Sequence, residues 1–152
     1  MNANTAEAIK IQDTDNDRVL REMVDKSYTR CRLTGTFLDD FYKTFVATSP
    51  KIAEKFRKTD WESQKRMLDH GIRHLILFFH EPSPVTAEKM IQLGESHSIS
   101  RLNIDPELYD FWVSALISAV AENDSEFSAE LEKAWKTVVE SGISVMKSMY
   151  NE

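Results

Sequence analysis

Hydrophobic residues recur along this chain at intervals of three and four, and they rarely alternate one by one with polar residues. The first spacing puts side chains on one face of an α-helix, whereas strict alternation is typical of half-buried strands. The chain has four glycines and four prolines, so few positions break the pattern. The sequence therefore predicts an all-α protein.

The N-terminal part divides into a tail and two helices. Residues 1–17 are polar and acidic, and we expect them to form a loose tail ahead of a single domain that spans residues 18–152. The first helix is predicted over 18–33 and ends before Gly35. Residues 37–46 then carry aromatic and aliphatic side chains at intervals of one and four, which predicts a second helix with a wide buried face.

Two capping signals mark the next helices. Ser49 can cap a helix and Pro50 suits its first position, so a short helix is expected there. Thr59 and Glu62 have the spacing of a capping box. This box predicts the start of a long helix over residues 60–79.

Three more helices complete the chain. One is expected over 86–97, after a proline-rich connector at 82–84, and the next begins near Asp105. The last follows a polar turn at 122–125. Because the apolar residues of both final helices repeat at three and four, we expect these two helices to pack as an antiparallel pair.

Composition restricts the class of partner. A chain of 152 residues that is 41% hydrophobic is sufficient for one domain with a core able to enclose a flat cofactor. A net charge of −6 disfavours nucleic acid and anionic lipid as partners. Cys31 is the single cysteine, which excludes an intrachain disulfide and fits a reducing cytoplasm. The longest apolar run, 75–79, is too short to cross a bilayer, and the N-terminal segment lacks a secretion signal.

His97 is the candidate metal ligand, although a lone histidine near a helix end is more often structural. Leu93, one turn earlier, and Ser96 offer a carbonyl and a hydroxyl that could hold one ring nitrogen and leave the other for a metal. The other histidines, which are His70, His74 and His80, lie off the apolar helix face or at its end and are expected at the surface.

Two polar residues interrupt apolar helix faces. Gln64 shares a face with Leu68, and a buried amide without a partner would cost about 2–7 kcal/mol, so Gln64 needs a partner or lies at a rim in contact with water. Tyr42 lies on an apolar stripe, where a buried aromatic ring with a satisfied hydroxyl is the usual finding. Neither residue by itself indicates a function.

Together these positions resemble the globin family, in particular the single-domain globins of bacteria and the globin domain of flavohaemoglobins. The resemblance covers nearly the whole chain after the tail and depends on the segment Leu93-x-x-Ser96-His97 and on the interval of fourteen residues between Tyr42 and Phe56. It implies a globin fold, a three-over-three helical sandwich around a haem pocket.

The resemblance also implies roles for residues on the distal side of that pocket. Tyr42 and Gln64 are expected to donate hydrogen bonds to a ligand on the iron, each worth about 1.5–3 kcal/mol. Leu68 would line the distal side and Phe56 would stack on the porphyrin edge, although both residues also suit an ordinary core. High affinity and slow release of dioxygen are the expected result.

On the proximal side, the resemblance makes His97 the axial iron ligand. Tyr109 matches a tyrosine that supports this histidine in flavohaemoglobins. The position of the supporting glutamate, however, falls on Tyr150. A strong proximal effect on the iron is therefore not expected. The segment after His97 is about two residues longer than in flavohaemoglobins, which leaves Arg101 to contact a haem propionate or solvent.

The expected function is reversible binding of dioxygen, and of NO or CO, at a b-type haem. No Cys-x-x-Cys-His segment is present for covalent attachment. Oxidation of nitric oxide is also implied, which leaves it open whether the protein is an enzyme. This activity would need a separate reductase, because the chain has no Gly-x-Gly-x-x-Gly loop. A gas sensor that acts through a partner and a haem-free interaction module remain alternatives, and so do a monomer and a homodimer.

Overall fold

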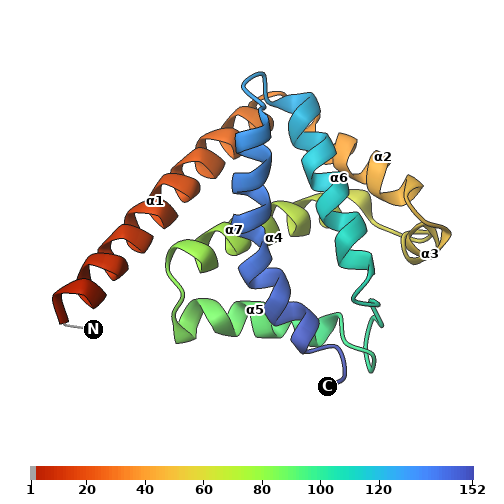
Figure 1. Cartoon of the computed structure of the whole chain (residues 1–152). Helices are drawn as coiled ribbons and strands as arrows, with labels where there is room; N and C mark the ends of the chain where they lie inside the picture. The colour runs from red at the N-terminus through yellow and green to blue at the C-terminus, as the bar shows by residue number, and fades with distance from the viewer. Residues whose placement is uncertain (1–2) are drawn as a thin grey trace.

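The computed structural model describes the backbone of residues 3–152 and the side chains from residue 15 onward. Within these residues the chain forms seven helices and no strand (Figure 1). The all-α prediction is confirmed. The helices are α1 (Ala3–Leu33), α2 (Phe37–Ala47), α3 (Pro50–Lys55), α4 (Trp61–His80), α5 (Pro84–Ser96), α6 (Leu108–Asn123) and α7 (Ala129–Ser148).

Six of the seven helices form two layers of three, and the short α3 packs against α2. α4 contacts α1 and α5 in one layer, and α6 contacts α2 and α7 in the other. α7 crosses the first layer and packs against α1, α4 and α5 (Figure 1). The expected three-over-three arrangement is thus present. The expected pairing of the last two helices is secondary, because α6 packs mainly on α2, and α7 packs mainly on α4 and α5.

α1 starts at Ala3, much earlier than the predicted start near residue 18. Residues 3–17 contain no glycine or proline, so nothing in them interrupts a helix that continues from the packed part. The side chains of residues 15–19 are exposed, and among the described side chains Val24 is the first that is fully buried. The boundary of the domain at residue 18 stays a prediction.

Helix caps agree with the sequence at one site and differ at another. Ser49 caps α3 by accepting a hydrogen bond from the Lys51 N–H, as predicted. The capping box at Thr59 was wrong, because the neighbouring Asp60 caps α4 by accepting a bond of 3.3 Å from the Ser63 N–H. A carboxylate is as good a cap as a hydroxyl, so α4 begins one residue later.

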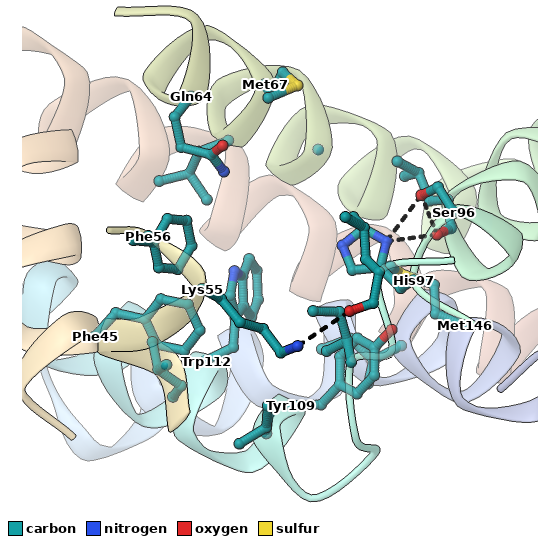
Figure 2. Close-up of a pocket in the computed structure, with 18 of the residues that line it drawn as sticks. Phe45, Lys55, Phe56, Gln64, Met67, Ser96, His97, Tyr109, Trp112 and Met146 are labelled. Carbon is teal, nitrogen blue, oxygen red and sulfur yellow. Dashed lines mark hydrogen bonds between the residues drawn. The ribbon is translucent and has the colours of Figure 1, made fainter. Parts of the chain in front are cut away.

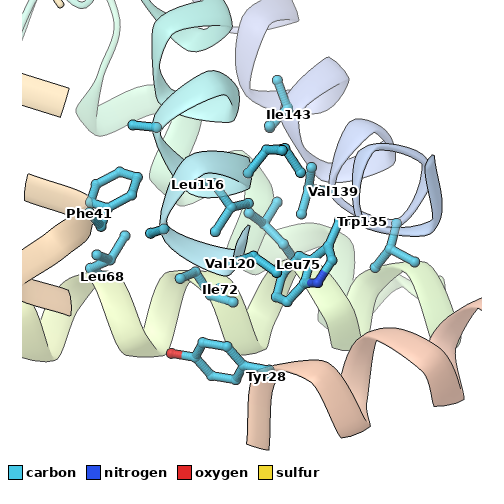
Figure 3. Packing of buried hydrophobic residues seen from close by; sticks show 14 of the residues in the cluster. Tyr28, Phe41, Leu68, Ile72, Leu75, Leu116, Val120, Trp135, Val139 and Ile143 are labelled. Carbon is cyan, nitrogen blue, oxygen red and sulfur yellow. The ribbon is translucent and has the colours of Figure 1, made fainter. Parts of the chain in front are cut away.

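The core lies between the two layers, where Trp135 and Val139 of α7 pack near Leu75 of α4 (Figure 3). Gly142 lets α7 approach α4 and α5 closely, since a Cβ there would collide with the Leu75 side chain and lie 2.8 Å from the Met90 sulfur. α4 is therefore packed closely against α7 at Leu75. No helix in the described part of the chain is apolar enough over a sufficient length to span a bilayer.

A buried carboxylate joins α1 to the turn between α6 and α7. Asp124, which is 3% exposed, accepts hydrogen bonds from the Ser27 hydroxyl at 2.6 Å and from Arg30 Nε at 2.6 Å. Trp135 Nε1 donates in turn to the Ser27 hydroxyl at 2.9 Å. Burial alone would raise the pKa of Asp124, but the bonds from Arg30, Ser27 and the Glu126 N–H outweigh it and lower the pKa below its usual range.

Candidate functional site

A cavity of about 430 Å³ lies between α4 on one side and α5, α6 and α7 on the other, and it is closed at one end by α2 and α3. Three exposed residues, Lys55, Met67 and Leu102, mark its mouth. Figure 2 shows Gln64 and Phe56 on one side of the cavity and His97 and Tyr109 on the other. Most of the remaining lining is aliphatic or aromatic: Phe45, Ile52, Leu68, Leu75, Leu93, Ile104, Leu108, Trp112, Ile143 and Met146.

His97 lies at the C-terminal end of α5, where the helix geometry holds its ring. Its Nδ1 is 2.6 Å from the Leu93 carbonyl oxygen and 3.0 Å from the Ser96 hydroxyl, which itself donates to the same carbonyl (Figure 2). Because a carbonyl can only accept, Nδ1 carries the proton. Nε2, which has no hydrogen-bond partner among the described residues, then keeps its lone pair.

The charge state of His97 suits a metal ligand. Burial lowers the pKa of His97 below its usual value, and the bond to the Leu93 carbonyl offsets only part of this effect. The imidazole is therefore neutral at pH 7, which is the form that binds metals. The other histidines, His70, His74 and His80, do not line the cavity.

Tyr42 and Gln64, which are far apart in sequence, meet at the opposite side of the cavity. The Tyr42 hydroxyl accepts a hydrogen bond of 3.1 Å from Gln64 Nε2 and donates one of 3.1 Å to the Gln64 backbone carbonyl. Burial raises the pKa of Tyr42 to about 12, and the bond from Gln64 opposes the rise. The hydroxyl is thus a protonated donor at every physiological pH.

Two aromatic rings pack against Tyr42: that of Phe56, which also lines the cavity, and that of Trp61, which does not. The ring of Phe56 lies 5.6 Å from that of Tyr42, measured between centroids. Trp61 stacks on Phe56 at 5.7 Å and meets Tyr42 edge-on at 5.2 Å. Sequence reasoning missed Trp61, because a tryptophan at the first position of a helix has no spacing signal that relates it to Tyr42. Leu68, 6% exposed, lines the cavity one turn after Gln64.

The remaining predicted residues differ in where they lie. Tyr109 lines the cavity with its ring 6.4 Å from that of His97, and burial raises its pKa to about 12. The Tyr150 hydroxyl donates a hydrogen bond of 2.6 Å to Asn103, whereas the hydrogen bonds of the His97 ring are to Leu93 and Ser96. Arg101 is exposed and is not among the residues that line the cavity. Lys55, which the sequence reasoning did not select, lies at the mouth.

The end of the described chain fastens the loop that follows His97. The Ile99 N–H donates to the Tyr150 carbonyl at 2.7 Å, and the Ser100 hydroxyl donates to the Glu152 carbonyl at 3.1 Å. Together with the Tyr150–Asn103 bond, these contacts hold the loop over residues 98–107 against the C-terminal end of α7. The loop contributes Leu102 and Ile104 to the cavity.

The comparisons with known proteins agree with this geometry. The model of the family described as Globin matches residues 39–146, which include Tyr42, Gln64 and His97. The chain belongs to the globin family. Its arrangement of helices is accordingly the all-α globin fold.

A solved bacterial structure is similar to this globin over most of its length. That protein, from Pseudomonas aeruginosa PAO1, is described as structurally highly homologous to a human hemoglobin. The two chains are 44% identical, with a TM-score of 0.84, and the match covers 88% of this globin and 99% of the other chain. No protein with a curated description gives a significant match.

The cavity fits the cofactor that globins generally bind. Its wall is largely apolar, as a porphyrin requires, and its volume lies within the range of cofactor sites. At Gly71 of α4, which lines the cavity, an added Cβ would meet no atom within 4 Å, so the wall leaves space there. Family membership and this lining together support a haem-binding globin.

Proposed function

We propose that this globin holds a b-type haem through His97 and binds dioxygen, and also NO or CO, beside Tyr42 and Gln64. The observation that carries the proposal is the orientation of His97. Its Nδ1 is fixed by the Leu93 carbonyl and the Ser96 hydroxyl, and its unpartnered Nε2 belongs to a ring on the opposite side of the cavity from Gln64. Haem, when bound, supplies ferrous iron that binds diatomic gases reversibly.

The chain's own residues would give the pocket its selectivity. The Leu93 carbonyl and the Ser96 hydroxyl keep the proton of His97 on Nδ1 and orient the ring. Phe56 and Leu68, which line the cavity, would pack against the porphyrin, and Tyr109 would close the proximal side. We found no carboxylate partner for His97 among the described residues, and a strong proximal effect is therefore not part of the proposal.

Tyr42 would be the main donor to the gas. Its hydroxyl accepts from the Gln64 amide, so a rotation about the C–O bond can turn its proton from the Gln64 carbonyl into the cavity while the Gln64 amide still holds the oxygen in place. Charge drawn onto a bound gas makes this a charge-assisted hydrogen bond of about 1.5–3 kcal/mol. We therefore propose high affinity and slow release.

Oxidation of nitric oxide in the same pocket is a further part of the proposal. It requires electrons from a reductase outside these 152 residues, because their four glycines are too far apart to form a dinucleotide-binding loop. A cytoplasmic protein would have access to such a donor. This part rests on the resemblance to the globin domain of flavohaemoglobins.

The visible spectrum of the hemin-loaded protein tests the proposal. We expect the wild type to show a haem spectrum in both the ferric and the ferrous state, and the ferrous spectrum to change reversibly with dioxygen. His97→Ala should lose this behaviour. His70→Ala is the matched control, since His70 is exposed and outside the cavity. No uptake of hemin by the wild type would favour a haem-free interaction module instead. Unchanged spectra in His97→Ala would move the axial ligand elsewhere.

A further inference from the structure

Lys55 is the one residue with a permanent charge among the described residues that line the cavity. It is the last residue of α3 and directly precedes Phe56. Its side chain extends from the side of Phe56 across the mouth, and Nζ donates a hydrogen bond of 3.1 Å to the Leu102 carbonyl (Figure 2). This contact places a positive charge at the open edge of a largely apolar cavity.

The chemistry of the proposed cofactor gives this charge a partner. A b-type haem is apolar except for two propionate carboxylates on one edge of the ring. Burying a carboxylate without a partner is costly, so that edge must lie where water or a cation is available. We propose that Lys55 binds a haem propionate and so determines which edge of the haem faces the mouth. This inference rests on the proposed function of the cavity.

Other cations near the mouth are placed less well for this role. Arg101 does not line the cavity. Lys51, one turn before Lys55, has its Nζ 3.5 Å from a Glu107 carboxylate oxygen, outside the lining. On the α4 side of the mouth the lining residue is Met67, which has no charge to offer a carboxylate. Lys55 is therefore the one cation, among the described residues that line the cavity, that a carboxylate at the mouth would meet.

The rate of hemin loss tests the inference directly. Transfer of hemin from the ferric protein to an excess of apomyoglobin is followed by absorbance for the wild type, Lys55→Met and Lys55→Arg. We expect Lys55→Met to lose hemin about three to five times faster, as suits an ion pair at a partly exposed site, with a smaller difference at high salt. Lys55→Arg should stay within about twofold of the wild type. Arg101→Met is the matched control and should leave the rate unchanged.

Hemin dimethyl ester separates charge from packing, because its propionates are esterified and carry no charge. Lys55→Met and the wild type should lose the ester at the same rate. An equal effect of Lys55→Met on hemin and on the ester would show that Lys55 acts by holding Leu102, and would overturn the inference. So would unchanged loss of hemin from Lys55→Met, or a larger effect of Arg101→Met. A wild type that takes up no hemin would refute the proposed function itself, and this inference with it.

Discussion

Replacing Asp124 by alanine should destabilise the fold by about 3 kcal/mol. The Ser27 hydroxyl is fully buried, and its bond to the carboxylate contributes about 1.5 kcal/mol. Arg30 makes two bonds to Asp124, but its side chain is 28% exposed, so we reduce their contribution to about 1 kcal/mol. The Glu126 N–H, 2.9 Å from the carboxylate, adds about 0.5–1 kcal/mol.

Urea unfolding followed by circular dichroism measures this difference. Asp110→Ala is the control, because Asp110 is 81% exposed and lies 3.7 Å from Lys147, and its loss should change the free energy of unfolding by less than about 0.5 kcal/mol. If Asp124→Ala costs no more than Asp110→Ala, the buried network does not hold α1 to the turn before α7.

The difference in free energy of unfolding between the wild type and Asp124→Ala should also depend on pH. The pKa of Asp124 is lowered in the folded state, so its ionisation stabilises the fold above the unfolded pKa of about 3.9, and this stability is lost as the pH falls through the lower folded pKa. The difference in free energy of unfolding between the wild type and Asp124→Ala should therefore be largest at pH 7 and smaller at pH 3. A gap that is the same at both pH values would refute the role of the charge.

Three further predictions concern the cavity and the helix contacts. Tyr42→Phe should speed dioxygen release from the hemin-loaded, reduced protein about tenfold or more in stopped-flow measurements, because one charge-assisted hydrogen bond is lost; an unchanged rate would remove Tyr42 from the distal role. The ratio of the dioxygen release rates of Tyr42→Phe and the wild type should stay constant between pH 6 and 9, since the pKa of Tyr42 is raised to about 12 and its hydroxyl stays protonated over this range. In the haem-free protein, Gly94→Ala should lower the melting temperature, since its Cβ would lie 3.0 Å from Met146 Cα. Gly71→Ala should raise the melting temperature of the same form, because its Cβ meets nothing within 4 Å and alanine is the better helix former. Equal shifts would contradict this account of the α5–α7 contact.

Much of the fold follows from periodicity, because the helices bury one face each. Gly35 lies between α1 and α2 with a φ of 79°, a left-handed conformation that a residue without a Cβ adopts readily, and the sequence predicted the break there. Errors arose where two local signals competed. Thr59 and Asp60 are both capping residues, and only the path of the chain decides that Asp60 lies at the helix end. Periodicity shows which face of α6 is buried but not which helix covers that face, so it did not predict that α6 packs mainly on α2.

The candidate site was predictable where its residues are close in sequence. Leu93, Ser96 and His97 lie within one helical turn, so their mutual contacts follow from helix geometry. The contact of Tyr42 with Gln64 needed the resemblance, since the two residues lie on different helices. Lys55 was missed because a lysine at the end of a short helix looks like any solvated residue until the loop it faces is known.

The contacts between the 98–107 loop and residues 150–152 have a consequence for the order of events during synthesis. α7 provides Ile143 and Met146 to the cavity wall, and Tyr150 and Glu152 fasten the loop that carries Leu102. A ribosome that has made the chain only as far as α6 therefore holds Tyr42, Gln64 and His97 but no closed cavity around them. We therefore expect cofactor capture only after α7 has been made, and a nascent chain stalled before α7 should expose an apolar surface to chaperones.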